Sequence, residues 1–201
     1  MRTLLISALL AAPLAASAGP NLLQNGSFED TAQANGTWST YAAIPGWTAN
    51  PAVEIRDNVA GTAKDGTNYA ELDAYSNGSI SQSFATIVGA AYDLSFWYSN
   101  RTNTAASTNG LSFNVGSGWL AAPLLPVNNS GNNQWSQGTY SFIANSTLTT
   151  LSFLGTGTSD SYGTSLDAVS VVAAVPEPST YAMMLGGLGA VVFIGRRRRQ
   201  P

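Results

Sequence analysis

The sequence contains neither cysteine nor histidine among its 201 residues. Without cysteine the chain can form no disulfide and no thiolate metal site. Without histidine it can form no Ser-His-Asp or Cys-His catalytic unit and no imidazole-ligated zinc centre. An enzyme built on this chain would therefore have to work with carboxylates, tyrosine, lysine or a hard metal ion.

Positive charge is scarce in the central part of the chain. Residues 20–175 contain only Arg56, Lys64 and Arg101 against ten acidic residues, which gives a formal net charge of 3 − 10 = −7. The other basic residues lie near the two ends and bring the whole chain to −3. Binding to nucleic acid requires lysine and arginine to neutralise phosphates, so we expect no nucleic-acid partner.

Sustained helical amphipathicity is a third absence. Short alternating runs bounded by glycine and asparagine occur instead, and this pattern indicates β-strands. The runs are Val53–Ile55, Tyr69–Tyr75, Ser79–Ala85, Tyr92–Tyr98, Leu111–Val115, Tyr140–Phe142, Leu148–Leu154 and Leu166–Val172. Turn signals separate them, so we predict an all-β antiparallel sandwich. The alternation predicts one buried and one solvated face in each strand.

Both ends of the chain have the pattern of targeting segments. Residues 1–18 combine Arg2, an apolar run and the sequence Ala16-Ser17-Ala18, which is typical of a secretory signal peptide that uses the Sec machinery. Near the other end, the apolar run Tyr181–Ile194 precedes four arginines. As a helix its 14 residues would span about 21 Å, against about 30 Å for a bilayer core. That length suits a transient stop in the membrane better than a permanent anchor.

The last segment, Val175-Pro-Glu-Pro-Ser-Thr180 with the apolar run and the arginine cluster, resembles the PEP-CTERM sorting signal of Gram-negative bacteria. The resemblance implies processing at Pro176, Glu177 and Pro178 by an exosortase, a membrane protease-transpeptidase. It also implies a precursor held transiently at the inner membrane and export to the cell surface or the exopolysaccharide matrix. We expect a signal peptide over 1–18, a β-sandwich over 19–174 and a sorting signal over 175–201.

A second resemblance covers residues 21–172. The ordered blocks resemble DUF642 and related galactose-binding-like jelly rolls, including carbohydrate-binding modules; they are Asn21–Glu29, Ile44–Trp47, Val53–Ile55, Asp65–Asp73, Gly78–Phe84, Gly89–Phe96 and Ser165–Val171. The resemblance implies a structural Ca²⁺ held by Glu29 and Asp167 where the first and last strands meet. Ca²⁺ takes six to eight oxygen ligands, so two carboxylates and several carbonyls would suffice. The alternative is that both acids cap turns at strand ends.

Four residues form a predicted carbohydrate site. Trp97 lies on the polar face of its strand, where an indole can stack on a sugar ring. Glu71 and Asp73 alternate out of another strand, and Arg101 begins the next loop. The alternative for Trp97 is a core position in a strand covered on both faces.

The most favoured function is an exported, noncatalytic surface or matrix protein that binds extracellular polysaccharide. One alternative is a structural or adhesive matrix component without a ligand site. The other is a glycoside hydrolase that uses Glu71 and Asp73, since carboxylates two residues apart on a strand lie about 6.6 Å apart. No nucleophile motif or base partner supports the hydrolase, so we do not expect an enzyme.

Overall fold

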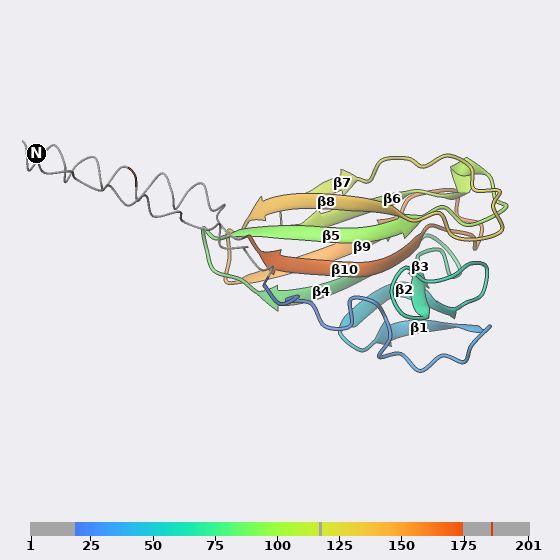
Figure 1. Ribbon diagram of the computed structural model, residues 1–201, viewed down its shortest axis with the longest axis horizontal. Helices are drawn as coiled ribbons and strands as arrows, with labels where there is room; N and C mark the ends of the chain where they lie inside the picture. Colours follow the sequence, from blue (N-terminus) through green and yellow to red (C-terminus); the bar gives the residue numbers. More distant parts are fainter. Residues whose placement is uncertain (1–18, 117, 175–185, 187–201) are drawn as a thin grey trace, which may run out of the picture. The chain divides into compact units, whose positions relative to one another are not determined.

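Antiparallel strands make up the part of the chain described by the computed structural model, residues 19–116, 118–174 and 186 (Figure 1). The strands are β1 Trp38–Ile44, β2 Trp47–Asp57, β3 Asn68–Glu71, β4 Ser79–Ala85, β5 Ala91–Ser99, β6 Leu111–Val115, β7 Trp119–Ala121, β8 Ser136–Ile143, β9 Leu148–Gly155 and β10 Ser165–Ala173, with a 3₁₀ turn at Ala106–Thr108. The predicted signal peptide, Pro176–Pro178 and the apolar run 181–194, Gly186 apart, lie outside the described residues. None of the helices in the described part is long and apolar enough to cross a membrane.

The long strand β2 joins two layers of sheet. At its start Thr48 pairs with Ser81 of β4, and near its end Arg56 pairs with Trp38 of β1 and Tyr69 of β3. The strands are hydrogen-bonded in the order β7-β6-β9-β4-β2-β3-β10-β5-β8. This continuous sheet therefore folds into two layers at β2. One layer contains β4, β9, β6 and β7, and the other contains β1, β3, β10, β5 and β8. This arrangement confirms the predicted all-β antiparallel sandwich.

Aromatic side chains fill the space between the two layers. The ring of Phe96 on β5 lies 5.2 Å from Phe113 on β6 and 5.1 Å from Phe153 on β9, measured between centroids. Trp47 packs 6.4 Å from Phe153 and 5.9 Å from Phe28. Burial of each such side chain stabilises the fold by roughly 1.5–3 kcal/mol, so this cluster fixes the two layers face to face.

Loops cover the outer face of the β3-containing layer at β3 and at the second half of β2. All four residues of β3 are buried, as is the second half of β2. The Tyr69 hydroxyl donates a hydrogen bond to the carbonyl of Val59, and Trp135 Nε1 donates to that of Thr62 at 3.0 Å. The prediction of one solvated face per strand is therefore wrong for β3 and the second half of β2, whereas β5 and β8 alternate between buried and more exposed residues. The predicted strand Tyr69–Tyr75 is also too long, because β3 ends at Glu71.

The two ends of the sandwich carry different connections (Figure 1). One end collects the long polar segments that follow β2, β5 and β9 and precede β8; they are residues 58–67, 100–110, 156–164 and 126–135. The opposite end carries the short β4–β5 and β8–β9 connections and the end of β10. We call them the loop-rich end and the short-turn end.

Candidate functional site

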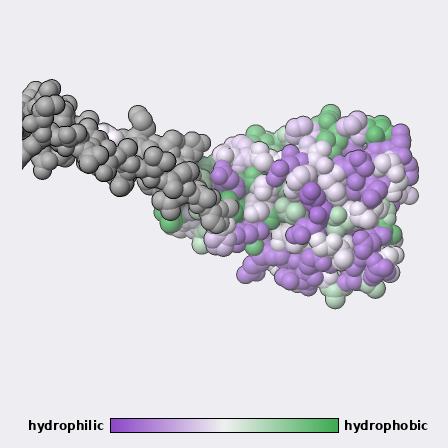
Figure 2. Space-filling view, in the orientation of Figure 1, coloured by the Kyte–Doolittle hydropathy of each residue, from purple (hydrophilic) through white to green (hydrophobic). Residues whose placement is uncertain are grey.

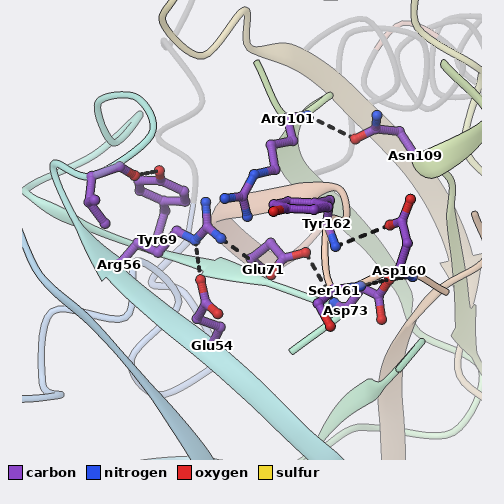
Figure 3. A network of polar contacts seen from close by, with 11 residues as sticks. Glu54, Arg56, Tyr69, Glu71, Asp73, Arg101, Asn109, Asp160, Ser161 and Tyr162 are labelled. Atoms are coloured by element: carbon purple, nitrogen blue, oxygen red, sulfur yellow. Dashed lines mark hydrogen bonds and ion pairs between the residues drawn. The ribbon is translucent and has the colours of Figure 1, made fainter. Parts of the chain in front are cut away.

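Charged side chains gather at the loop-rich end, on the covered face of the β3-containing layer (Figure 3). Register places them together, since Glu54 of β2 pairs with Glu71 of β3 and Arg56 lies two residues beyond Glu54. Arg56 Nε donates a hydrogen bond to Glu54, and Arg56 Nη2 lies 3.6 Å from Glu71 Oε2. All three side chains are almost completely shielded from solvent.

Glu71 is the most constrained carboxylate of this cluster. Burial raises the pKa of Glu71 to about 7, the charge of Arg56 opposes that rise, and the charge of Glu54 adds to it. Its Oε1 accepts the N–H of Asp73 at 3.2 Å, whereas its Oε2 has no hydrogen-bond donor. Glu71 thus retains one acceptor oxygen without a donor, as does Asp73 with its Oδ1.

Asp73 anchors the 156–164 loop over this cluster. Its Oδ2 accepts the N–H groups of Asp160 and Ser161 at 2.9 and 3.1 Å. Gly163 permits close approach, because a Cβ at this position would lie 2.5 Å from Glu71 Oε1. Glu71 and Asp73 are both 0% exposed, so the expectation that they alternate out of a strand onto a polar surface is wrong. The loop that covers them is distant in sequence.

Arg101 and Tyr162 form the part of the cluster that lies next to the surface. The Arg101 guanidinium carbon lies 4.4 Å from the centre of the Tyr162 ring, and Tyr162 is 48% exposed. The backbone N–H of Arg101 donates to Asn109 Oδ1 at 2.8 Å, while Nη1 of its side chain has no acceptor. A half-exposed aromatic ring therefore lies against a guanidinium that has a buried, unpartnered N–H group.

Trp97 lies elsewhere on the same layer. It is half-buried on β5 and pairs in register with Asp167 of β10. Lys64 Nζ lies 3.7 Å from the centre of its ring, a cation–π contact that occupies a face of the indole. The structure thus brings Glu71, Asp73 and Arg101 together around the 156–164 loop, and places Trp97 against the 58–67 segment.

Glu29 and Asp167 hold one turn from two sides. Glu29 Oε1 accepts the N–H groups of Thr67 and Asn68 at 2.9 and 2.6 Å. Asp167 Oδ2 accepts those of residues 64 and 65 at 2.7 and 3.0 Å. Burial raises the pKa of Asp167 to about 7, against the opposing effect of these backbone donors. Both acids therefore act as turn caps, whether or not an ion is also bound.

Oxygen atoms suited to a hard cation lie on the Glu29 side of this turn. Thr31 Oγ1 and Asn68 Oδ1 are buried without a hydrogen-bond partner, and Asn68 Nδ2 donates to the Thr31 carbonyl at 2.9 Å. Like the Glu29 carboxylate, these are oxygen ligands of the type that Ca²⁺ prefers. Within residues 19–116, 118–174 and 186, no three acidic, histidine or cysteine side chains group closely enough to bind a metal by themselves.

Sequence reasoning missed Tyr162, Gly163 and the buried pair Glu54–Arg56. Tyr162 had a signal, since it is the lone aromatic residue in the polar segment from Thr156 to Thr164. Glu54 and Arg56 had another, because opposite charges two residues apart in a strand lie on one face. That this face is covered depends on loops distant in sequence, which no local pattern reveals.

A second polar surface lies on the opposite layer. A row of uncharged side chains crosses its strands in register, and the row ends at the half-exposed Trp119; it runs Thr48, Ser81, Ser152, Asn114, Trp119. Hydroxyl and amide groups of this kind can also contact sugars, so this row is an alternative binding surface.

Two family models match this chain, one over the β-sandwich domain and one over its C-terminal segment. Residues 21–172 match the family described as a protein of unknown function, DUF642. The chain belongs to the DUF642 family. Residues 174–199 match the PEP-CTERM protein-sorting motif. The DUF642 domain is therefore followed by a sorting signal, which marks an exported protein.

Individual proteins that resemble this chain share little of its sequence. Halomucin of Haloquadratum walsbyi is 28% identical over 163 residues, which cover 76% of this chain and 2% of that protein. A family 61 carbohydrate-binding module solved with β-1,4-galactotriose is 15% identical, with a TM-score of 0.44 over 78% of this chain and 100% of that one. A family 16 module is 15% identical, with a TM-score of 0.48 over 76% and 99%. Similarity at this level does not indicate what the DUF642 domain binds.

Proposed function

We propose that this protein is a noncatalytic component of the cell surface or extracellular matrix that binds polysaccharide at its loop-rich end. The observation that carries the proposal is the pair formed by Tyr162 and Arg101, an aromatic ring on a guanidinium at the rim of a charged cluster. We further propose that an exosortase processes the precursor at Pro176–Pro178, as the sorting motif implies.

The chemistry of this rim suits a sugar. An aromatic ring offers an apolar surface to the C–H face of a pyranose, and its hydroxyl can bond to the polar edge. Arg101 Nη1 and Glu71 Oε2 lie behind the ring, buried and without hydrogen-bond partners, so they are not open to a sugar unless the 156–164 loop moves. The exposed groups beside the ring are those of Ser159, Asp160 and Ser161, which can bond to the hydroxyls of a neutral sugar because these both donate and accept.

The same geometry supports a noncatalytic role. A general acid or base must reach the reacting oxygen within hydrogen-bond distance. Glu71 and Asp73 are fully buried, and Asp73 is committed to the backbone of the 156–164 loop. A glycosidic bond at the surface would not reach either carboxylate unless this loop moved.

Affinity electrophoresis of the protein through a panel of neutral and acidic polysaccharides tests the site. We expect Tyr162→Ala to weaken binding about tenfold, which corresponds to about 1.4 kcal/mol. Trp119→Ala is the matched control, because Trp119 is equally exposed but lies on the other layer. Loss of binding in Trp119→Ala alone would assign the ligand to the uncharged row instead.

Two outcomes would overturn the function itself. Failure of the wild-type protein to bind any polymer would favour a structural or adhesive role without a discrete ligand. Release of reducing sugar from a bound polymer, abolished by Glu71→Gln, would favour a hydrolase. Intact-mass analysis of surface-exposed protein tests the processing, since retention of Arg196–Arg199 would contradict cleavage at Pro176–Pro178.

A structural Ca²⁺ is a separate part of the proposal. Glu29, Thr31 and Asn68 would hold it through their side-chain oxygens, and the ion would tie the first segment of the domain to the 64–68 turn. We expect calcium to raise the thermal midpoint relative to chelator in the wild type and to have less effect in Glu29→Gln. Equal thermal midpoints of the wild type in calcium and in chelator would contradict a structural Ca²⁺ site.

A further inference from the structure

The short-turn end exposes four large aliphatic side chains. They are Ile87 and Val88 in the β4–β5 connection, Ile143 at the end of β8 and Leu148 at the start of β9, with exposed fractions of 72%, 59%, 71% and 60%. We call these four residues the apolar tip. Large aliphatic side chains that cluster on one surface usually mark a contact with a partner or a membrane.

Hydrogen bonds hold the two connections of the apolar tip together. The N–H of Gly89 donates to the carbonyl of Ala144 at 2.8 Å, and that of Thr86 donates to the carbonyl of Thr147 at 3.0 Å. Thr86 Oγ1 donates to the Ser146 carbonyl at 2.8 Å. The four aliphatic side chains therefore stand on a braced pair of turns.

No charged residue occurs in either connection, residues 85–91 or 143–149. The nearest along these strands is Asp93, whose carboxylate accepts a hydrogen bond from Ser141 Oγ at 2.6 Å. Hydrophilic and intermediate residues cover most of the face seen in Figure 2. An uncharged, aliphatic tip on an acidic, polar domain suits an apolar partner.

The path of the chain identifies that partner. The N–H of Ala174 donates to the carbonyl of Ala91 at 2.9 Å, so the chain leaves the domain beside the β4–β5 connection. Only the six residues 175–180 separate this point from the apolar run 181–194. At 3.3–3.6 Å per residue, a fully extended chain from Ala174 to Tyr181 spans at most about 25 Å. A domain held by that run in a bilayer thus keeps its short-turn end near the lipid.

We propose that the apolar tip docks into the lipid interface while the sorting segment holds the precursor at the membrane. Aliphatic and aromatic side chains enter the headgroup–acyl boundary to a depth of about 5–10 Å in interfacial binding. Docking would orient the domain with its loop-rich end away from the bilayer and present Pro176–Pro178 at the membrane surface. This inference depends on the sorting motif and not on polysaccharide binding.

The experiment uses the full chain reconstituted in vesicles of phosphatidylethanolamine and phosphatidylglycerol. Since the chain has no cysteine, Ile87→Cys carries a single fluorophore, and Ala105→Cys carries it at the loop-rich end as the matched control. We expect lipids spin-labelled at the headgroup boundary to quench the fluorophore at residue 87 strongly and the one at residue 105 weakly. Equal quenching at the two positions would overturn the proposal.

A charge variant separates lipid docking from other contacts. Val88→Asp with Leu148→Asp places two carboxylates on the tip at exposed positions, and an unchanged urea midpoint would show that the fold is intact. We expect these changes to abolish quenching at residue 87 while the chain stays in the vesicle through residues 181–194.

A fluorophore at residue 87 that is shielded from water but not quenched by lipid would show a second copy or the chain's own segment on the tip, and would overturn the proposal. Unchanged affinity for polysaccharide in this variant would show that the two sites are independent.

Discussion

The same strands end in buried charged side chains at the loop-rich end of this DUF642 domain and in exposed aliphatic side chains at its short-turn end. At the loop-rich end, long connections fold back over the sheet and bury Glu54, Arg56, Glu71 and Asp73. At the short-turn end, compact connections leave Ile87, Val88, Ile143 and Leu148 in solvent. Burying charge and exposing aliphatic surface both lower the stability of the fold, and folding alone requires neither feature. Under the two proposals made above, each end faces its own partner.

The largest expected effect concerns the charge balance of the loop-rich end. Arg56→Ala removes the cation that faces both Glu54 and Glu71 and leaves two buried carboxylates without their partner. Breaking a buried pair in this way costs about 3–5 kcal/mol, so we expect a loss of that size in the free energy of unfolding in urea. A loss below about 1 kcal/mol would mean that water reaches the cluster and that the end is not closed.

The pH dependence of stability should come from the same end. Burial holds the pKa of Glu71 at about 7, above its ordinary 4.5, so the folded state binds this proton more tightly than the unfolded chain. The stability linked to that proton is present in full below about pH 4.5 and is lost as the pH rises through 7, by up to about 3 kcal/mol. We expect Glu71→Gln to remove part of the decline measured by urea unfolding between pH 5 and 8 and to leave the part that comes from Asp167, whose pKa burial also raises to about 7. An identical slope in both proteins would contradict the assignment to Glu71.

A smaller loss is expected at the braced turns of the short-turn end. Thr86 Oγ1 bonds to the Ser146 carbonyl and lies 2.9 Å from Thr149 Oγ1. Thr86→Val keeps the shape and removes this hydroxyl, so we expect a loss of about 1 kcal/mol in the free energy of unfolding. No measurable loss would show that the two connections are not braced through this side chain.

The smallest effect should be at the tip itself. Val88 is mostly exposed and lies in a connection whose backbone bonds do not involve its side chain. We expect Val88→Ser to change the free energy of unfolding by less than about 0.5 kcal/mol, as surface substitutions usually do. A destabilisation well above 1 kcal/mol would indicate that the tip is part of the fold and not a docking surface.

The sequence predicts the sandwich better than the site, and particular residues explain why. The alternation of Tyr92, Leu94, Phe96 and Tyr98 predicts a buried face that the structure confirms, because strand period is local information. The burial of Glu71 and Asp73 depends on Ser161 and Gly163, about 90 residues further along the chain. The match of Tyr162 to Arg101 depends on the same distant loop. Of the four residues predicted for the carbohydrate site, Glu71, Asp73 and Arg101 lie together around that loop and Trp97 does not, and the sequence did not indicate how the three meet.

The most direct test of the two-ended account is hydrogen–deuterium exchange of the full chain in vesicles, with and without a polysaccharide that it binds. We expect the vesicle to slow exchange in residues 85–91 and 143–149, and the polysaccharide to slow exchange in residues 100–110 and 156–164. Each partner should leave the other end unchanged. Protection of the same end by both partners, or slower exchange along the β4–β9 surface on addition of polysaccharide, would contradict the account.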